Sequence, residues 1–267
     1  MRGELRRLAP LLKLVPLNEF TYRLEVSLFT LMVIGRVFLF VVLWNAVYKP
    51  GQVAAGLTVD QVITYSTLAA ILTAHSDVAN IVDSFTHRIR DGTVSYLFVR
   101  PVGPLPYMLG LQAGGSLYRM AWLIVFAVAG AAIGVVTFPA QLAILLWSIL
   151  SLLLAEAVVI ILFQFVELIA FWTLETRDIR SVYSFVVQLL GGGLVPLWFF
   201  PGWAKTVLLG LPFAAALSDP LSLFVGRIPV SDAPWVVASQ LFWVVALALL
   251  MRTVWRGAER RVVVQGG

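Results

Sequence analysis

Six apolar runs, each about as long as a bilayer is thick, constrain this chain more than any other feature of its sequence. A helix of about 20 apolar residues crosses the roughly 30 Å hydrocarbon core of a membrane. The sequence therefore predicts an all-α polytopic integral membrane protein with six transmembrane helices in one domain, residues 1–267. The predicted spans are residues 25–48, 59–82, 105–136, 141–174, 181–199 and 234–254.

The composition supports a membrane protein and offers little for catalysis. Charged residues make up 12% of the chain and hydrophobic residues 60%, whereas about a quarter of a soluble domain is charged. The chain has no cysteine and only two histidines, so thiol chemistry and cysteine metal sites are excluded. We expect no catalytic residue, no metal site and no cofactor bound by this chain.

The positive charges orient the predicted bundle. With the N-terminus in the cytoplasm, three basic residues, Lys49, Lys205 and Arg227, fall in outer segments, and Arg36 and Arg119 fall within spans. Basic residues gather on the cytoplasmic side of membrane proteins, so both termini are predicted to be cytoplasmic. This distribution also explains the net charge of +5 without nucleic acid. The remaining basic residues lie on the inner side: Arg2, Arg6, Arg7, Lys13, Arg23, Arg88, Arg90, Arg100, Arg177, Arg180, Arg252, Arg256, Arg260 and Arg261.

Two segments outside the spans are apolar but too broken to cross a membrane. In residues 1–24, leucines alternate with basic residues, which is typical of an amphipathic helix in the headgroup layer; a solvated tail is the alternative. Residues 200–233 are interrupted by Pro201, Pro212 and Pro220. We expect re-entrant helices here on the outer side, with a seventh and an eighth short span as the alternative.

Ionisable residues inside the predicted spans need partners, because a charge at mid-membrane costs about 2.5–3.5 kcal/mol. Glu156 and Glu167 are eleven residues apart and share a helix face, with Arg119 between them in depth on the preceding span. The sequence predicts an ion pair between Arg119 and one of these glutamates. A structural pair, a polar wall of a substrate path and a proton relay all remain open. The intramembrane polar residues are Arg36, Asp77, Arg119, Glu156 and Glu167.

Two further spans have unusual residues. The second is the least apolar, so we expect it to face protein or a cavity rather than lipid. The fifth contains Gly191, Gly192 and Gly193, followed by Pro196. This pattern predicts a flexible or broken helix end, and we expect it to act as a hinge near an outer gate.

The segment between the second and third spans is basic and punctuated by glycine and proline. Residues 83–102 read DSFTHRIRDGTVSYLFVRPV. The first part predicts a short surface helix with one apolar face, and Asp91-Gly92 is a helix-stop signal. An ordinary positive-inside loop is the alternative.

This segment resembles a motif of ABC-2 type transporter permeases, in particular the six-span bacterial permeases that lack a fused ATPase. The match rests on Ile89, Gly92, Val94, Phe98, Arg100 and Pro101, with phenylalanine at 98 where leucine is common. The length, the span number and the broken loop before the last span are also similar.

The resemblance implies that residues 83–101 form a cytoplasmic coupling helix that receives a separate ATPase subunit. It also implies two ATPase copies, which bind ATP and Mg²⁺, and a second permease, identical or related. The implied coupling residues are Asp83, Phe85, His87, Arg88, Ile89, Arg90, Asp91, Gly92, Arg100 and Pro101.

ATP hydrolysis is not expected of this chain, because it has no G-x-x-x-x-G-K-[ST] phosphate-binding loop. An exporter subunit for an amphipathic or lipidic substrate, working by alternating access, is the preferred function. The alternative is a proton-coupled secondary transporter that uses Asp77, Glu156 or Glu167. That alternative predicts inverted repeats, and the sequence shows none.

Overall fold

The computed structural model describes residues 23–49, 53, 56–74, 88, 93, 95–99, 102–173 and 177–265, and these residues form helices without a β-strand. The predicted all-α class is therefore confirmed. The predicted N-terminal amphipathic helix lies outside the described residues. The longer helices are α2 (Arg23–Val47), α3 (Val59–Ala74), α6 (Pro104–Ala132), α7 (Leu142–Thr173), α8 (Arg177–Leu190) and α11 (Ala233–Gln265). The shorter ones are α5 (Ser95–Phe98), α9 (Gly202–Leu209) and α10 (Asp219–Phe224), with a π-helical turn at Ala214–Ser218 and 3-10 turns at Leu197–Phe199 and Val230–Asp232.

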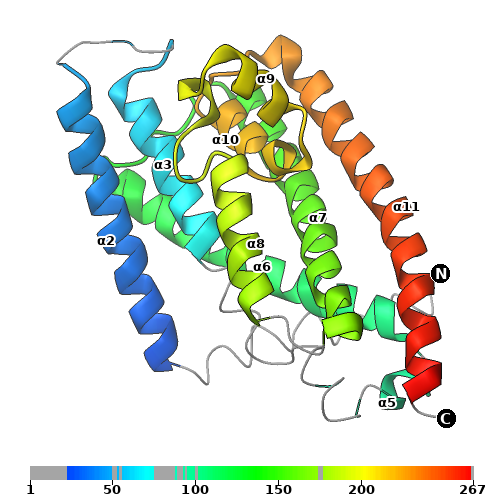
Figure 1. The fold of residues 1–267 in the computed structure, drawn as a ribbon. Helices are drawn as coiled ribbons and strands as arrows, with labels where there is room; N and C mark the ends of the chain where they lie inside the picture. Colours follow the sequence, from blue (N-terminus) through cyan, green and yellow to red (C-terminus); the bar gives the residue numbers. More distant parts are fainter. Residues whose placement is uncertain are drawn as a thin grey trace.

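The helices form one bundle with α2 at one edge and α11 at the other, while α6 runs obliquely to the rest (Figure 1). The start of α2 and the end of α11 lie at the same end of the bundle, where α5 lies beside the end of α11, and α9 lies at the opposite end (Figure 1). We call these the α5 end and the α9 end. Lys205 of α9 and Arg252 of α11 therefore lie toward opposite ends, which agrees with the predicted charge asymmetry.

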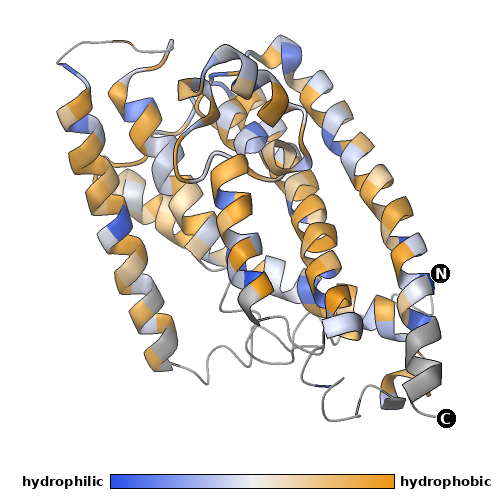
Figure 2. Cartoon of the chain, in the orientation of Figure 1, coloured by the Kyte–Doolittle hydropathy of each residue, from blue (hydrophilic) through white to orange (hydrophobic). Residues whose placement is uncertain are grey.

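Four described helices are long and apolar enough to cross a membrane: α2, α6, α7 and α11. Hydrophobic residues predominate along α2 and α7 (Figure 2), and many are exposed on the bundle surface. The number of candidate spans rises to five if α9 and the segment Ala214–Phe224 together form one span, with a bend of 81° at the break between them. Helix α3 has 16 residues and the apolar part of α8 is shorter still, so the six-span count stays a prediction.

The fifth predicted span was wrong at both ends. Helix α8 begins at Arg177 and ends at Leu190, nine residues before the predicted end. It stops because Gly192 adopts φ 82°, a left-handed conformation that ends helices. Gly193 and Leu194 then donate backbone hydrogen bonds to the Gln188 carbonyl.

Two other boundaries differ from the prediction. Helix α6 ends four residues early, because Gly134 has φ 77° and the Val135 N–H turns back to the Gly130 carbonyl. Helix α11 continues to Gln265, eleven residues further than predicted. Its 33 residues correspond to about 50 Å of helix, so it is longer than the hydrocarbon core.

Helix α3 lies inside the bundle, as its polar residues predicted. Every residue from Val62 to Thr73 is buried. Its hydroxyls are bonded to neighbouring elements: Ser66 accepts from the Trp44 indole at 2.9 Å, and Thr64 accepts from the Thr137 N–H at 2.9 Å. These bonds fix α3 against α2 and against the turn between α6 and α7.

The element before α11 is broken: it consists of α9 and the segment Ala214–Phe224. We call it the broken element, and its second part packs inside the bundle. The π-helical turn Ala214–Ser218 is buried throughout, and it packs with α10 against α7, α3 and α11. The fully buried Gln240 amide of α11 donates to the carbonyls of Ala215 and Ser151 at 2.9 and 3.1 Å. Irregular backbone at membrane depth needs such partners within the protein, so Gln240 holds the break in place.

Candidate functional site

The described part of the predicted coupling segment is anchored in the bundle. Leu97 of α5 has no exposed surface and packs in a core cluster with Tyr107 of α6, Phe171 of α7 and Met251 of α11. Its neighbours Tyr96 and Val99 are 67% and 81% exposed. Helix α5 thus joins an exposed surface to three long helices.

Arg88 also contacts this end of the bundle. Its guanidinium lies over the Tyr107 ring, 5.7 Å from the centroid, at the range of a cation–π contact. The Thr93 hydroxyl donates to the Arg88 carbonyl at 3.4 Å. The other predicted coupling residues lie outside the described residues: Asp83, Phe85, His87, Ile89, Arg90, Asp91, Gly92, Arg100 and Pro101.

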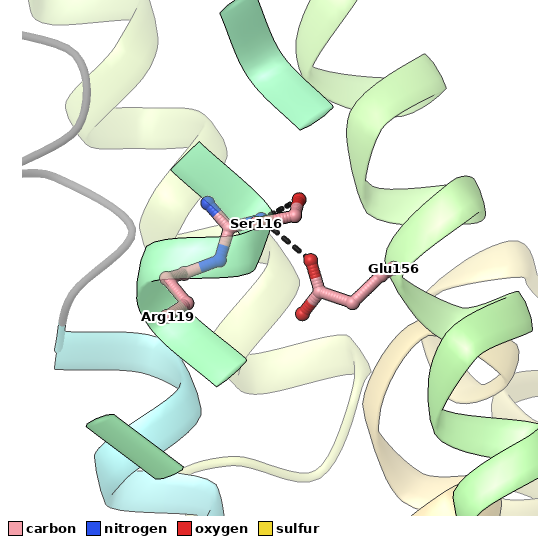
Figure 3. A network of polar contacts seen from close by, with 3 residues as sticks. All are labelled: Ser116, Arg119 and Glu156. Atoms are coloured by element: carbon pink, nitrogen blue, oxygen red, sulfur yellow. Dashed lines mark hydrogen bonds and ion pairs between the residues drawn. The ribbon is translucent and has the colours of Figure 1, made fainter. Parts of the chain in front are cut away.

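The predicted ion pair between Arg119 and a glutamate of the next helix is present, and the glutamate is Glu156. One guanidinium nitrogen of Arg119 lies 2.6 Å from Glu156 Oε2 and 2.7 Å from the Ser116 hydroxyl (Figure 3). All three residues are buried. Charge-assisted bonds of this length are strong, and this one ties the middle of α6 to the middle of α7.

Glu167 has a different partner, which the sequence did not predict. Its carboxylate lies 2.6 Å from the Arg180 guanidinium of α8. The sequence places Arg180 only among the basic residues on the cytoplasmic side. Glu167 lies two turns before the end of α7, and Arg180 lies in the first turn of α8. The short α7–α8 connection is the signal that could have identified this pair.

Arg36 of α2 is held by neutral groups among the described residues. Its guanidinium donates to the Thr73 hydroxyl at 3.0 Å and to the Gly193 carbonyl at 3.2 Å. It also lies 5.5 Å from the centroid of the Phe40 ring, one turn along α2. The end of α8 offers free carbonyls and the negative end of a helix dipole, so a cation there needs no carboxylate. Asp77 lies outside the described residues.

The triglycine turn, Gly191–Gly192–Gly193, is closely packed. The Tyr65 hydroxyl of α3 donates to the Gly192 carbonyl at 3.1 Å. A Cβ on Gly191 would lie 2.5 Å from the Val187 carbonyl oxygen, and one on Gly193 would lie 2.9 Å from Leu217. Only glycine allows this approach. A hinge or gate role for the turn and Pro196 stays a prediction.

Two cavities lie next to each other. The first is lined by α3, α6, α7, the turn before α7 and the broken element, and the second by α3, α6, α7, the broken element and α8. The first, of about 200 Å³, has an almost entirely apolar lining. The second, of about 50 Å³, contains the Arg119–Glu156 pair and the hydroxyls of Thr73 and Tyr183. We call them the apolar cavity and the polar cavity, and Leu152 of α7 lines both. Within the described residues no group of three His, Cys, Asp or Glu side chains could hold a metal ion.

Comparison with known protein families gives one match, and it agrees with this architecture. The model of the ABC-2 family transporter protein matches residues 31–266. This range includes both cavities and every described helix apart from the start of α2. No curated protein and no solved structure matches the chain. The chain is a multi-pass membrane protein that belongs to the ABC-2 family of transporter proteins.

Proposed function

We propose that this chain is the permease subunit of an ATP-driven exporter that moves an amphipathic or lipidic substrate out of the bacterial cytoplasm across the inner membrane. Two copies of a separate ABC ATPase bind ATP and Mg²⁺ and supply the driving force. A second permease, identical or related, completes the pathway. Both termini and the α5 end face the cytoplasm.

The observation that supports this proposal is the position of Leu97. Residues 83–101 are the segment that would receive the ATPase, and α5 lies in its second half. Because Leu97 belongs to the same core cluster as residues of α6, α7 and α11, a displacement of the segment can reach these helices through that cluster. Protein interiors are close-packed and transmit such displacements. The spans can then re-pack and expose the substrate path alternately to the two sides.

The ion pairs favour this proposal over a proton-coupled carrier. Glu156 and Glu167 each lie 2.6 Å from an arginine. A proton carrier would have to break these buried ion pairs in each cycle, because a carboxylate cannot hold its arginine and a transported proton at the same time. ATP as the energy source agrees with this arrangement.

The test is co-purification in detergent with an ABC ATPase encoded beside this chain, in the wild type and in Arg88→Glu. Reversal of the charge places a carboxylate against the Tyr107 ring face and removes a cation from the docking segment. We expect the ATPase to bind the wild type and to be lost or uncoupled in Arg88→Glu. Lys205→Glu, the same reversal at the α9 end, is the matched control and should retain the ATPase. Equal binding to all three proteins, or to none, would refute coupling through this segment.

A further inference from the structure

The two cavities together match the shape of one class of ligand. The apolar cavity opens on the side of the bundle between α6 and α7, where its lining residues Ile124, Val128 and Ile149 are about half or more exposed. In a membrane this side faces lipid or a second permease. The polar cavity lies deeper, around the buried Arg119–Glu156 pair.

The partition between the cavities is thin. Leu152 lines both, and three adjoining elements contribute residues one turn apart to the two sides: α3, α6 and the broken element. Leu68 of α3 lines the apolar cavity and Leu72 lines the polar one; Leu221 and Leu217 of the broken element divide in the same way. A single leucine side chain can change rotamer without moving a helix, so Leu152 can join the two spaces.

The polar cavity also contains an unsatisfied group. The Tyr183 hydroxyl is buried and has no hydrogen-bond partner in the part of the chain that the structure describes. A buried hydroxyl without a partner is costly, and ligands or waters usually satisfy such groups. The cavity of about 50 Å³ holds only a few heavy atoms, since one water needs about 10–15 Å³.

We propose that these cavities form one binding site for a single-chain amphiphile with a compact, uncharged, hydrogen-bonding head, such as a long-chain alcohol or amide. The head lies beside Tyr183 and the Arg119–Glu156 pair, and the chain lies in the apolar cavity. A charged head is disfavoured because the arginine and the glutamate already neutralise each other. The role of this site in export depends on the proposed function. Binding of the amphiphile to the site does not.

The orientation of the site fits uptake from the cytoplasmic leaflet. Along α7, which runs from the α9 end to the α5 end, Leu145 and Ile149 line the apolar cavity and Glu156 lines the polar one. The head of the amphiphile therefore points toward the α5 end and its chain toward the α9 end. With the topology proposed above, this head-to-chain direction is that of an amphiphile in the inner leaflet, so the molecule can enter without turning over. It must move deeper than its place in the leaflet, because the Arg119–Glu156 pair lies at the middle of α7.

Photolabelling of the permease alone, in nanodiscs and without ATP or ATPase, tests the site. The probe is hexadecanol with a diazirine in its chain. We expect saturable labelling of residues 123–128 and 145–152, which unlabelled hexadecanol displaces and hexadecane of the same length does not. Labelling spread over the exposed face of α2, labelling that does not saturate, or equal displacement by hexadecane would mean bulk lipid contact only and would overturn the proposal.

Matched variants locate the head and the chain. Tyr183→Phe keeps the ring but removes the hydroxyl, and it should weaken displacement by hexadecanol about two- to tenfold. Leu152→Trp fills the partition and should abolish saturable labelling, whereas Leu153→Trp, at a neighbouring position that is 59% exposed, should not. If Leu152→Trp fails to fold, Tyr183→Phe decides, because unchanged displacement in that variant refutes the head site. Saturable labelling without any ATPase coupling would refute ATP-driven export and leave the site intact.

Discussion

Two arginines lie within apolar helices of this chain, and the structure satisfies them in different ways. Arg119 is paired with a carboxylate on the next helix, whereas Arg36 bonds a hydroxyl and a backbone carbonyl. The first solution could be predicted, because Arg119, Glu156 and Glu167 were the ionisable residues at matching depths. The second could not, because every residue has a carbonyl and only the fold decides which carbonyl is free.

We expect the contributions of Arg119 and Glu156 to the free energy of unfolding to depend strongly on each other. Arg119→Ala or Glu156→Ala leaves one buried charge alone and should each cost about 3–5 kcal/mol. A double replacement by apolar residues, Arg119→Met with Glu156→Leu, should recover most of that loss, since both charges leave together. Thermal unfolding of the purified protein measures the effects. Additive losses in the double variant would contradict a direct pair.

At the level of elements, the sequence predicted which segments are helical better than where they end. The burial of α3 followed from its polar residues, since a lipid-facing helix would not contain them. A broken helix end was predicted at the three glycines, but the span was still placed as far as residue 199. Apolar residues 194–199 continue the hydrophobic run past the turn, and hydrophobicity alone cannot distinguish a helix from the 3-10 turn found there.

The triglycine turn gives a prediction about backbone strain. Gly192→Ala places a Cβ at φ 82°, only 2.8 Å from the Tyr65 hydroxyl oxygen, and a left-handed alanine alone costs about 1–2 kcal/mol. We expect Gly192→Ala to lower the thermal midpoint clearly, and less so in a Tyr65→Phe background, where the hydroxyl is absent. Gly202→Ala, whose Cβ would meet nothing within 4 Å, is the control. Equal effects at Gly192 and Gly202 would argue against this packing.

Helix α5 gives a prediction about coupling. Leu97→Ala removes a fully buried side chain and should destabilise the α5 end by about 2–5 kcal/mol. Tyr96→Ala, at an exposed neighbour on the same helix, should leave stability nearly unchanged. Hydrogen exchange of α5 and the adjoining ends of α6 and α11 distinguishes the two variants. If α5 exchanges equally fast in both, Leu97 is not the anchor.

For the whole molecule, the separation of charge between the two ends defines a topology that can be measured. The native chain has no cysteine, so single cysteines report position without background. We expect Lys205→Cys at the α9 end to react with a membrane-impermeant maleimide in intact cells. Arg252→Cys on α11 should react only after the cells are opened. Labelling of both variants from the same side would contradict the proposed orientation.

The fold class could be predicted from sequence, because hydrophobic length is a property of single segments. The family could be predicted because one short segment, residues 83–102, resembles its motif. The cavities could not be predicted, because their walls come from five elements far apart in the chain. In the sequence, nothing marks Leu68, Leu152 and Leu221 as residues that line one cavity. Only packing of α3, α7 and the broken element brings them around one space.

The bonds of Arg36 also determine when the protein can finish folding during its synthesis. Thr73 follows Arg36 by 37 residues, but Gly193 follows it by 157. At about 5–20 residues per second, the ribosome needs roughly 8–30 s to reach that glycine. During this interval α2 resides in the bilayer with one of the two bonds of its mid-span cation still missing. Arg36 therefore gains its second hydrogen bond only after the residues that follow α8 have been synthesised.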